Sequence, residues 1–419
     1  MTDPQTPESS RWHVALTQIT RANGTIIVLA ILLSFVIGGI MIAATDPAVQ
    51  EASGYFFARP VDTLAAIWDA VAGAYAALFR GAIFNYEADT FVRAIRPLTE
   101  TLTYATPLIA GGLGVALAFR VGMFNIGGRG QMLVGAAAAG WVGFGVDLPW
   151  GLHTLLALLA GIAAGAIWGG IAGVIKARTG AHEVILTIML NYIAFYLVSW
   201  MLRTPGLLQK PGSSDPKSPA MKDTAVFPSL LGPQFNLHAG FLVVIAATVL
   251  VWWILSRSNL GFQFRAVGEN PHAARVAGID VKRMYVLGMV MSGGLVGIAG
   301  VAQVLGTSTN GFAAGVDAGI GFDAITVALL GRSTPWGTFA AGLLFGAFKA
   351  GSFTMKAAEQ IPLEIVLVVQ SFIVLFIAAP PLVRAIFVLP SPERDRRKRE
   401  RSRMKAQLAV ASHQAGGDR

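Results

Sequence analysis

The chain has 419 residues, of which 54% are hydrophobic, 13% are charged and none is cysteine, and its formal net charge is +9. Soluble domains carry about 25% charged residues, so this composition excludes an ordinary soluble protein, a disordered chain and a disulfide-rich scaffold. The lack of cysteine also excludes a thiolate nucleophile, an iron–sulfur cluster and a cysteine-ligated zinc site.

Apolar stretches of about 20 residues are long enough to cross a membrane as helices. Ten stretches have this character, at 23–44, 101–119, 128–146, 150–176, 184–203, 238–256, 284–305, 321–331, 337–355 and 362–388. The first is longer than the apolar region of a signal peptide, which favours a retained signal anchor. The alternative is a cleaved signal peptide, for which Ala43–Ala44 offers only a poor cleavage site. We therefore predict an all-α, multi-pass protein of the inner (plasma) membrane, with a transmembrane domain over 23–388.

The distribution of charge predicts the orientation, because Lys and Arg collect in cytoplasmic loops. With both termini inside, the inside segments and their flanks carry 22 of the 32 basic and 9 of the 23 acidic residues. This arrangement places the tail 1–22, the loop 257–283 and the basic tail 389–419 in the cytoplasm. The run Glu393–Lys405 follows an apolar span, which favours contact with anionic lipid over nucleic acid.

Two long segments are then outside, 45–100 and 204–237. The first contains an amphipathic stretch at 72–84 that is suited to the membrane interface. The second is rich in Pro, Ser, Lys and Asp, which is typical of an exposed loop.

Glycines recur every four residues within three of the apolar stretches, which places them on one helix face and lets another backbone approach closely. The residues are Gly161, Gly165, Gly169, Gly173, Gly293, Gly297, Gly342 and Gly346. Tight helix packing is the favoured interpretation, and it predicts a compact bundle.

The segment Phe124–Gln131 (FNIGGRGQ) interrupts two apolar stretches with polar residues and glycines. Irregular backbone at membrane depth is tolerated only where protein or a water-filled cavity covers it. The segment is thus either an inter-helix turn that packs on its neighbours or a direct part of a transport path. The order span, turn, span in 102–146 recurs in 321–355, as in transporters built from repeats.

The loop 257–283 contains a short helix signature. Asn270 is a favourable N-cap, Pro271 suits the first helical position, and Gly278 can end the helix in a left-handed conformation. Such a helix is too short to be stable alone in water. It is either a docking element for a cytoplasmic partner or an ordinary connecting helix.

Three stretches resemble one family of transport proteins: Phe119–Ala136 (FRVGMFNIGGRGQMLVGA), Val267–Gly300 and Phe322–Gly346. They are similar to permease subunits of ABC importers of the ribose and branched-chain amino acid class, and most similar to its nucleoside and simple-sugar subgroup. One difference is Arg129, where many members have Glu.

The resemblance implies a permease for a nucleoside or simple sugar, which is not itself an enzyme and has no catalytic residue, metal or cofactor. ATP would be used by separate ATP-binding subunits, and the absence of a P-loop from this chain agrees with that. The other implied partners are a second permease subunit, forming a heterodimer, and an extracytoplasmic solute-binding protein. The implied ATPase-coupling residues are Asn270, Ala273, Ala274, Arg275 and Gly278.

Polar residues within the apolar stretches are the candidates for the substrate path: Asn125, Gln131, Asn191, Tyr192, Gln303, Asp323 and Gln370. Amide and aromatic groups such as Asn191 and Tyr192 suit a nucleobase or ribose. The alternative for Asn191 is a structural bond between two helices.

Two other classes remain open. A secondary active transporter of a small polar solute would need no ATPase and usually has coupling carboxylates within its spans; Asp323 and Glu364 lie near span starts. A membrane enzyme would need clustered His, Asp or Glu at one membrane face, and the six histidines are scattered.

Overall fold

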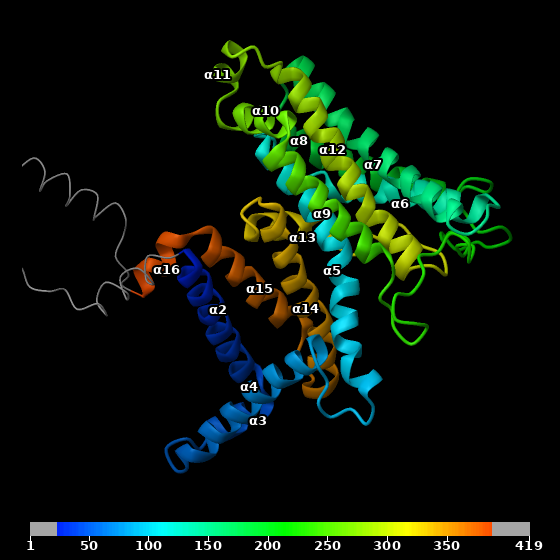
Figure 1. The fold of residues 1–419 in the computed structure, drawn as a ribbon. Coiled ribbons are helices and arrows are strands. Elements are labelled where there is room, and N and C mark those ends of the chain that lie inside the picture. The colour runs from blue at the N-terminus through cyan, green and yellow to red at the C-terminus, as the bar shows by residue number, and fades with distance from the viewer. Residues whose placement is uncertain (1–22, 388–419) are drawn as a thin grey trace, which may run out of the picture. The chain divides into compact units, whose positions relative to one another are not determined.

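The computed structural model describes residues 23–387, and the regular elements within this range are helices (Figure 1). The predicted tails 1–22 and 389–419 lie outside the described residues. The α-helices are α2 (Asn23–Thr45), α3 (Pro47–Ser53), α4 (Pro60–Ala82), α5 (Phe91–Arg120), α6 (Gly128–Gly145), α7 (Leu152–Thr179), α8 (Glu183–Met201), α9 (Gly240–Arg257), α10 (Asn259–Glu269), α11 (Pro271–Val276), α12 (Val281–Ala302), α13 (Ile320–Leu330), α14 (Pro335–Glu359), α15 (Leu363–Ala378) and α16 (Pro380–Ile386). A π-helix, η1 (Gln303–Thr307), directly continues α12.

The chain divides into two compact units. The larger comprises Thr45–Val366 and contains α3 to α14. The other combines Met1–Ala44 with Leu367–Arg419, of which the structure describes α2, most of α15, and α16. The elements of the candidate site described below belong to the larger unit.

Each of the ten apolar stretches coincides with a helix or, for the last, with the pair α15 and α16, which is bent by 96°. Within the described residues, seven helices are long and apolar enough to cross a membrane, or eight if the bent pair is one span. The seven are α2, α4, α5, α7, α8, α9 and α12 with η1. The predicted all-α membrane fold is confirmed, while the number of ten spans and the orientation stay predictions.

The segment 45–100, which the sequence predicts to be an outside loop, contains a long helix. Most of its amphipathic stretch 72–84 forms the last part of α4, which ends at Ala82. This helix of 23 residues is itself long and apolar enough to span a membrane. The shortest predicted span, 321–331, corresponds to the eleven-residue helix α13.

Two helices form the centre of the larger unit. The apolar window of α5 is 83% buried and that of α12 is 72% buried, whereas the other five spans are 17–39% buried. A helix that is apolar on all sides belongs in a protein core or in a membrane. The helices α5 and α12 lie in the protein core, and the less buried helices keep outward faces that are suited to lipid.

Glycine contacts hold the bundle together, as the four-residue spacing predicts. On α7 and α12, a Cβ added at Gly297 would lie 2.5 Å from the Gly161 carbonyl oxygen, and one at Gly169 would lie 2.5 Å from that of Met289. On α14, a Cβ at Gly346 would lie 2.6 Å from the Thr101 oxygen of α5. Only glycine lets these backbones approach so closely.

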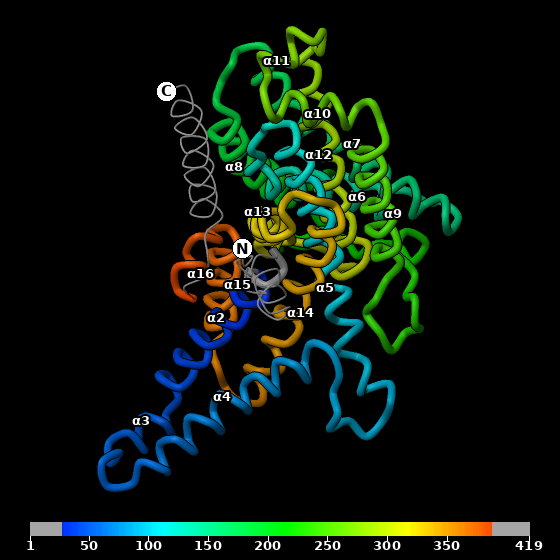
Figure 2. The backbone as a smooth tube through the Cα atoms, turned by 60° about the vertical axis from the view of Figure 1, so that its left-hand side comes forward, coloured from blue at the N-terminus to red at the C-terminus, as the bar shows by residue number. Residues whose placement is uncertain are grey.

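The short helices α10 and α11 lie at one end of the α7–α12 pair, away from the segment between α8 and α9 (Figures 1 and 2). At the same end, the Arg120 Nε at the close of α5 donates to the Ser333 carbonyl oxygen at 2.8 Å. The turns that follow α5 and α13 therefore start from the same end of the unit as the loop 257–283.

Candidate functional site

The polar turn after α5 is folded inward and is held by a network of buried amides. The Asn125 Nδ2 donates to the Gln131 Oε1 at 3.0 Å and to the Ser292 Oγ at 2.8 Å. The Asn125 Oδ1 accepts from the Gly127 backbone N–H at 2.9 Å and from the Gln131 Nε2 at 3.1 Å. All three side chains are buried. The side-chain amides of the turn thus find hydrogen-bond partners within the protein, as polar groups at irregular backbone inside a membrane require.

Asn191 of α8 ties down the next part of the same turn. Its Oδ1 accepts from the Gly130 backbone N–H at 2.8 Å, and its Nδ2 donates to the Ile126 carbonyl oxygen at 2.9 Å. These bonds occupy both functional groups of the buried amide. They favour the structural role of Asn191 over direct contact with substrate.

The contacts of this turn place it deep in the bundle. Ser292 is the twelfth of the 22 residues of α12, and Asn191 is the ninth of the 19 residues of α8. At 1.5 Å per residue, Ser292 lies roughly 16 Å from the start of α12. The segment therefore packs on its neighbours, as the first interpretation predicts, but at the middle of the helices rather than at their ends.

A second irregular segment reaches the same depth from the opposite direction. Residues 308–319 begin beside the segment between α8 and α9, where the Met221 backbone N–H donates to the Thr309 oxygen at 2.8 Å. They end at the start of α13, where Ala318 and Gly319 both have positive φ angles, of 45° and 81°. A Cβ added at Gly128 would lie 2.8 Å from the Gly321 oxygen, so α6 and α13 begin side by side.

An ion pair joins these two helix starts. The Arg129 Nε lies 3.2 Å from the Asp317 Oδ2, and the Arg129 Cζ lies 4.7 Å from the centre of the Phe195 ring on α8. The Asp317 side chain is only 5% exposed, whereas that of Arg129 is 28% exposed. A carboxylate and an aromatic ring therefore fix the guanidinium, while part of it stays accessible.

The other predicted path residues are not part of the network around Asn125. Tyr192 is 55% exposed on α8. Gln303 is half-buried at the start of η1, and Asp323 is half-buried on α13 near Lys349 of α14. Gln370 is on α15, in the other unit.

Sequence reasoning missed Ser292, Phe195, Asp317 and Lys349. The first two resemble ordinary residues of apolar helices and carry no local signal. Asp317 did carry one, because it is the single acidic residue between Asp280 and Asp323. An intramembrane ionisable residue is a functional candidate by default, and Lys349 also meets that criterion.

The predicted short helix in the loop 257–283 is present as α11. The Asn270 Oδ1 accepts from the His272 and Ala273 backbone N–H groups, both at 3.0 Å, and Gly278 has φ of 82°. One detail is a correction. Ala274 is 3% exposed and packs within its own chain, so it cannot be an open contact for a partner, whereas Val276 is 91% exposed.

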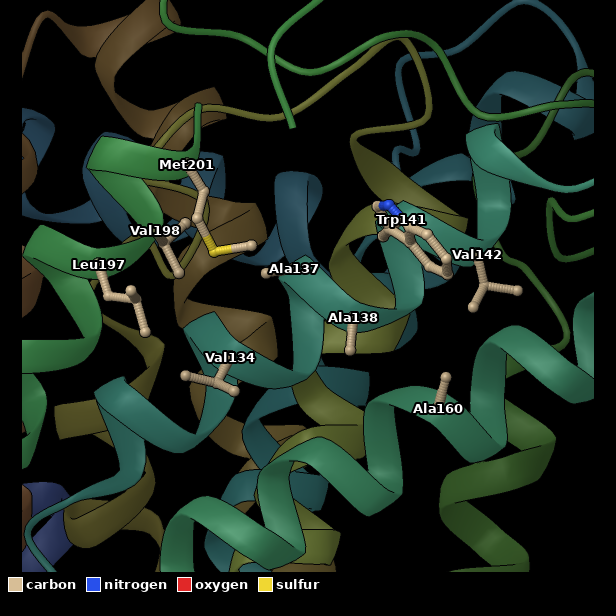
Figure 3. Close-up of a pocket in the computed structure, with 9 residues that line it drawn as sticks. All are labelled: Val134, Ala137, Ala138, Trp141, Val142, Ala160, Leu197, Val198 and Met201. Carbon is tan, nitrogen blue, oxygen red and sulfur yellow. The ribbon is translucent and has the colours of Figure 1, made fainter. Parts of the chain in front are cut away.

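A separate pocket of about 420 Å³ lies between α6, α7 and α8 (Figure 3). Its lining consists of apolar side chains from these three helices: Val134, Ala137, Ala138, Trp141, Val142, Ala160, Leu197, Val198 and Met201. The Trp141 indole nitrogen is its one polar side-chain atom. A polar solute needs several placed polar groups, so this pocket does not suit a nucleoside or sugar. Within residues 23–387, no group of three or more His, Asp or Glu side chains could hold a metal ion.

Residues 98–378 match the family described as branched-chain amino acid transport system / permease component. The chain is 39% identical to the guanosine ABC transporter permease protein NupP of Bacillus subtilis, over 75% of this chain and 88% of that protein. It is 36% identical to the nucleoside ABC transporter permease protein NupB of Lactococcus lactis, over 73% and 85% of the two chains. It is also 36% identical to the glucose ABC transporter permease protein TsgB13 of Haloferax volcanii, over 67% and 75%. No solved structure matches the chain.

Proposed function

The chain belongs to the family of branched-chain amino acid transport system permease components, and from this premise we propose that it forms the path by which a nucleoside crosses the membrane. The chain is a permease of the ABC importer type and an integral protein of the inner membrane. It is a transport protein rather than an enzyme. Membership of this class excludes the two alternative functions, a secondary transporter and a membrane enzyme.

The observation that supports a neutral, polar substrate is the chemistry at the middle of the bundle. Amide and hydroxyl groups surround the turn at Asn125, and the ion pair beside it, Arg129 with Asp317, carries no net charge. A nucleoside has no net charge, a flat ring and several hydrogen-bonding edges. The relatives named for guanosine and nucleosides support the same substrate class.

A simple sugar is the second candidate, because one relative of similar identity is named for glucose. A sugar also suits amide and hydroxyl groups. It has no flat aromatic ring, however, and would gain less than a nucleobase from stacking on the half-exposed Tyr192.

Permeases of this class act with ATP-binding subunits and a substrate-binding protein. For this chain we propose that those ATP-binding subunits supply the energy by hydrolysing ATP, and that a second, different permease completes the membrane part as a heterodimer. In the resulting path, Asn125, Gln131 and Asn191 hold the irregular turn in place. Tyr192, Gln303, Asp323 and Gln370 are the remaining candidates for substrate contact.

Uptake by cells that produce the complete transporter tests the substrate class. We expect uptake of radiolabelled nucleosides that depends on an intact ATP-binding subunit, and little uptake of glucose. The control is an ATP-binding subunit whose P-loop lysine is replaced. Uptake of glucose without uptake of any nucleoside would contradict the proposal and favour the sugar.

A further inference from the structure

We infer that Arg129 is a substrate-recognition residue, and that its guanidinium donates two hydrogen bonds to the oxo edge of a 6-oxopurine nucleoside. The inference rests on the proposed function, because it requires a path that carries nucleosides. It adds the part of the substrate that is recognised and the residue that recognises it.

The first step is the unused hydrogen-bonding capacity of Arg129. An arginine has five N–H donors. Here the Nε forms an ion pair with the Asp317 Oδ2 at 3.2 Å but no hydrogen bond, and the terminal amino groups make no hydrogen bond to any residue in 23–387. The side chain is 28% exposed. An ionisable side chain at the middle of a membrane bundle costs free energy, so its presence there marks it as a functional candidate. The terminal donors of Arg129 are open to a ligand.

The second step is the fixed position of the guanidinium. Asp317 is 3% exposed, and its Oδ2 also accepts from the Gly319 backbone N–H at 3.4 Å, which helps to hold the carboxylate in place. The Arg129 Cζ lies over the Phe195 ring, 4.7 Å from its centre. A planar fork held in this way loses little entropy when it binds a ligand through two parallel hydrogen bonds.

The net charge of the Arg129–Asp317 pair limits the kind of ligand that it can bind. Asp317 neutralises Arg129, so the pair gives little net attraction to a phosphate or carboxylate. The ligand that gains most is a neutral molecule with two adjacent acceptors. Tyr192, one helical turn before Phe195 and 55% exposed, offers an aromatic face on which a flat ring can stack.

The pattern of acceptors on the nucleobase decides which nucleoside the guanidinium prefers. A 6-oxopurine presents two adjacent acceptors, O6 and N7, and one arginine donates to both. Adenine presents N7 but has an amino group in place of O6, so one arginine donor would face another donor. Guanosine and inosine should therefore be preferred over adenosine.

The test compares uptake of labelled inosine and adenosine by the complete transporter. Arg129→Lys keeps the positive charge but loses the planar fork. The double variant Arg129→Gln/Asp317→Asn removes both charges, so that neither partner is left buried without its counterion. Arg203→Gln is the control, because Arg203 is exposed and lies outside the cluster. Recovery of the assembled complex is measured for every variant.

We expect the wild type to take up inosine with a higher kcat/KM than adenosine. We expect this preference to fall at least about fivefold in both Arg129 variants and to persist in Arg203→Gln, since one bidentate contact gives discrimination of that order. An unchanged preference in assembled variants, or equal losses for both nucleosides, would overturn the role of Arg129 while leaving nucleoside transport in place. A wild type that takes up neither nucleoside would overturn this inference, and it would overturn the proposed function as well when no other nucleoside is taken up.

Discussion

Ala274 and Val276 lie two residues apart on α11 but in opposite environments, since the first is 3% exposed and the second is 91% exposed. The helix α11 itself lies at one end of the larger unit (Figure 2). An exposed apolar side chain on a capped helix at such a place is suited to a groove on a partner subunit. In a permease of this class, we expect that partner to be the ATP-binding subunit.

Val276→Glu should uncouple transport from ATP hydrolysis. Burial of an unpaired carboxylate in an interface costs several kcal/mol, so substrate-stimulated ATP hydrolysis in reconstituted vesicles should fall several-fold while membrane insertion stays normal. Val276→Ala is the matched control and should retain most of the stimulation. Normal stimulation in Val276→Glu would exclude α11 from the interface. Ala274→Glu should instead lower the yield of folded protein.

Asn191→Ala separates structural support from substrate binding. Its two hydrogen bonds, to Gly130 and Ile126, indicate that the variant should weaken the complex, by about 0.5–1.5 kcal/mol for each lost bond. Uptake per folded complex should change little. Thermal stability and uptake are measured on the same preparation, and slow uptake by a fully stable complex would restore Asn191 as a substrate contact.

Gly165→Ala should destabilise the contact between α7 and α12. Its added Cβ would collide with the Gly293 carbonyl oxygen, and overpacking of this kind costs about 1–3 kcal/mol. Gly145→Ala is the matched control, because nothing lies within 4 Å of its added Cβ. The thermal midpoint in detergent should fall for the first variant and not for the second. Equal midpoints would mean that the glycine contact contributes no stability.

The buried imidazole of His238 should make the folded protein less stable in acid. Burial lowers the pKa of this imidazole to about 4, while an unfolded chain has a histidine pKa of about 6.5. Neither ring nitrogen has a hydrogen-bond partner within the described residues. Because the unfolded state binds the proton first, stability is complete above pH 6.5 and is lost progressively down to pH 4, by about 3 kcal/mol in total.

Unfolding of the detergent-solubilised protein at pH 7.5 and pH 5 measures this loss. His238→Leu should be less sensitive to the change than the wild type. His272→Gln, at an exposed position, is the control and should behave like the wild type. Equal acid sensitivity in His238→Leu would assign the loss to other groups.

The orientation can be measured by cysteine labelling, because the chain has no native cysteine. Asp215→Cys and Ala277→Cys are both at exposed positions. With the N-terminus inside, a membrane-impermeant maleimide should label position 215 from outside and position 277 only after the membrane is opened. The reverse pattern would invert the predicted topology. A further cysteine between α3 and α4, at exposed Phe57, shows whether α4 crosses the membrane.

The sequence by itself determined the features that depend on local composition and periodicity. Apolar length predicted the helices, the Asn270, Pro271 and Gly278 signals predicted α11, and the four-residue glycine spacing predicted close packing of α7. These properties follow from residues that are near one another in the chain, where helix geometry fixes which side chains share a face.

Only the tertiary structure decided what each polar side chain contacts. The sequence marked Asn125 and Asn191 as polar groups in apolar surroundings, but it did not contain their partners, Ser292 and the backbone of the turn itself. It likewise gave no reason to join Arg129 to Asp317, which lie far apart in the chain. Hydrogen bonds and ion pairs of this kind form between elements brought together by packing, and no local periodicity encodes which elements those are.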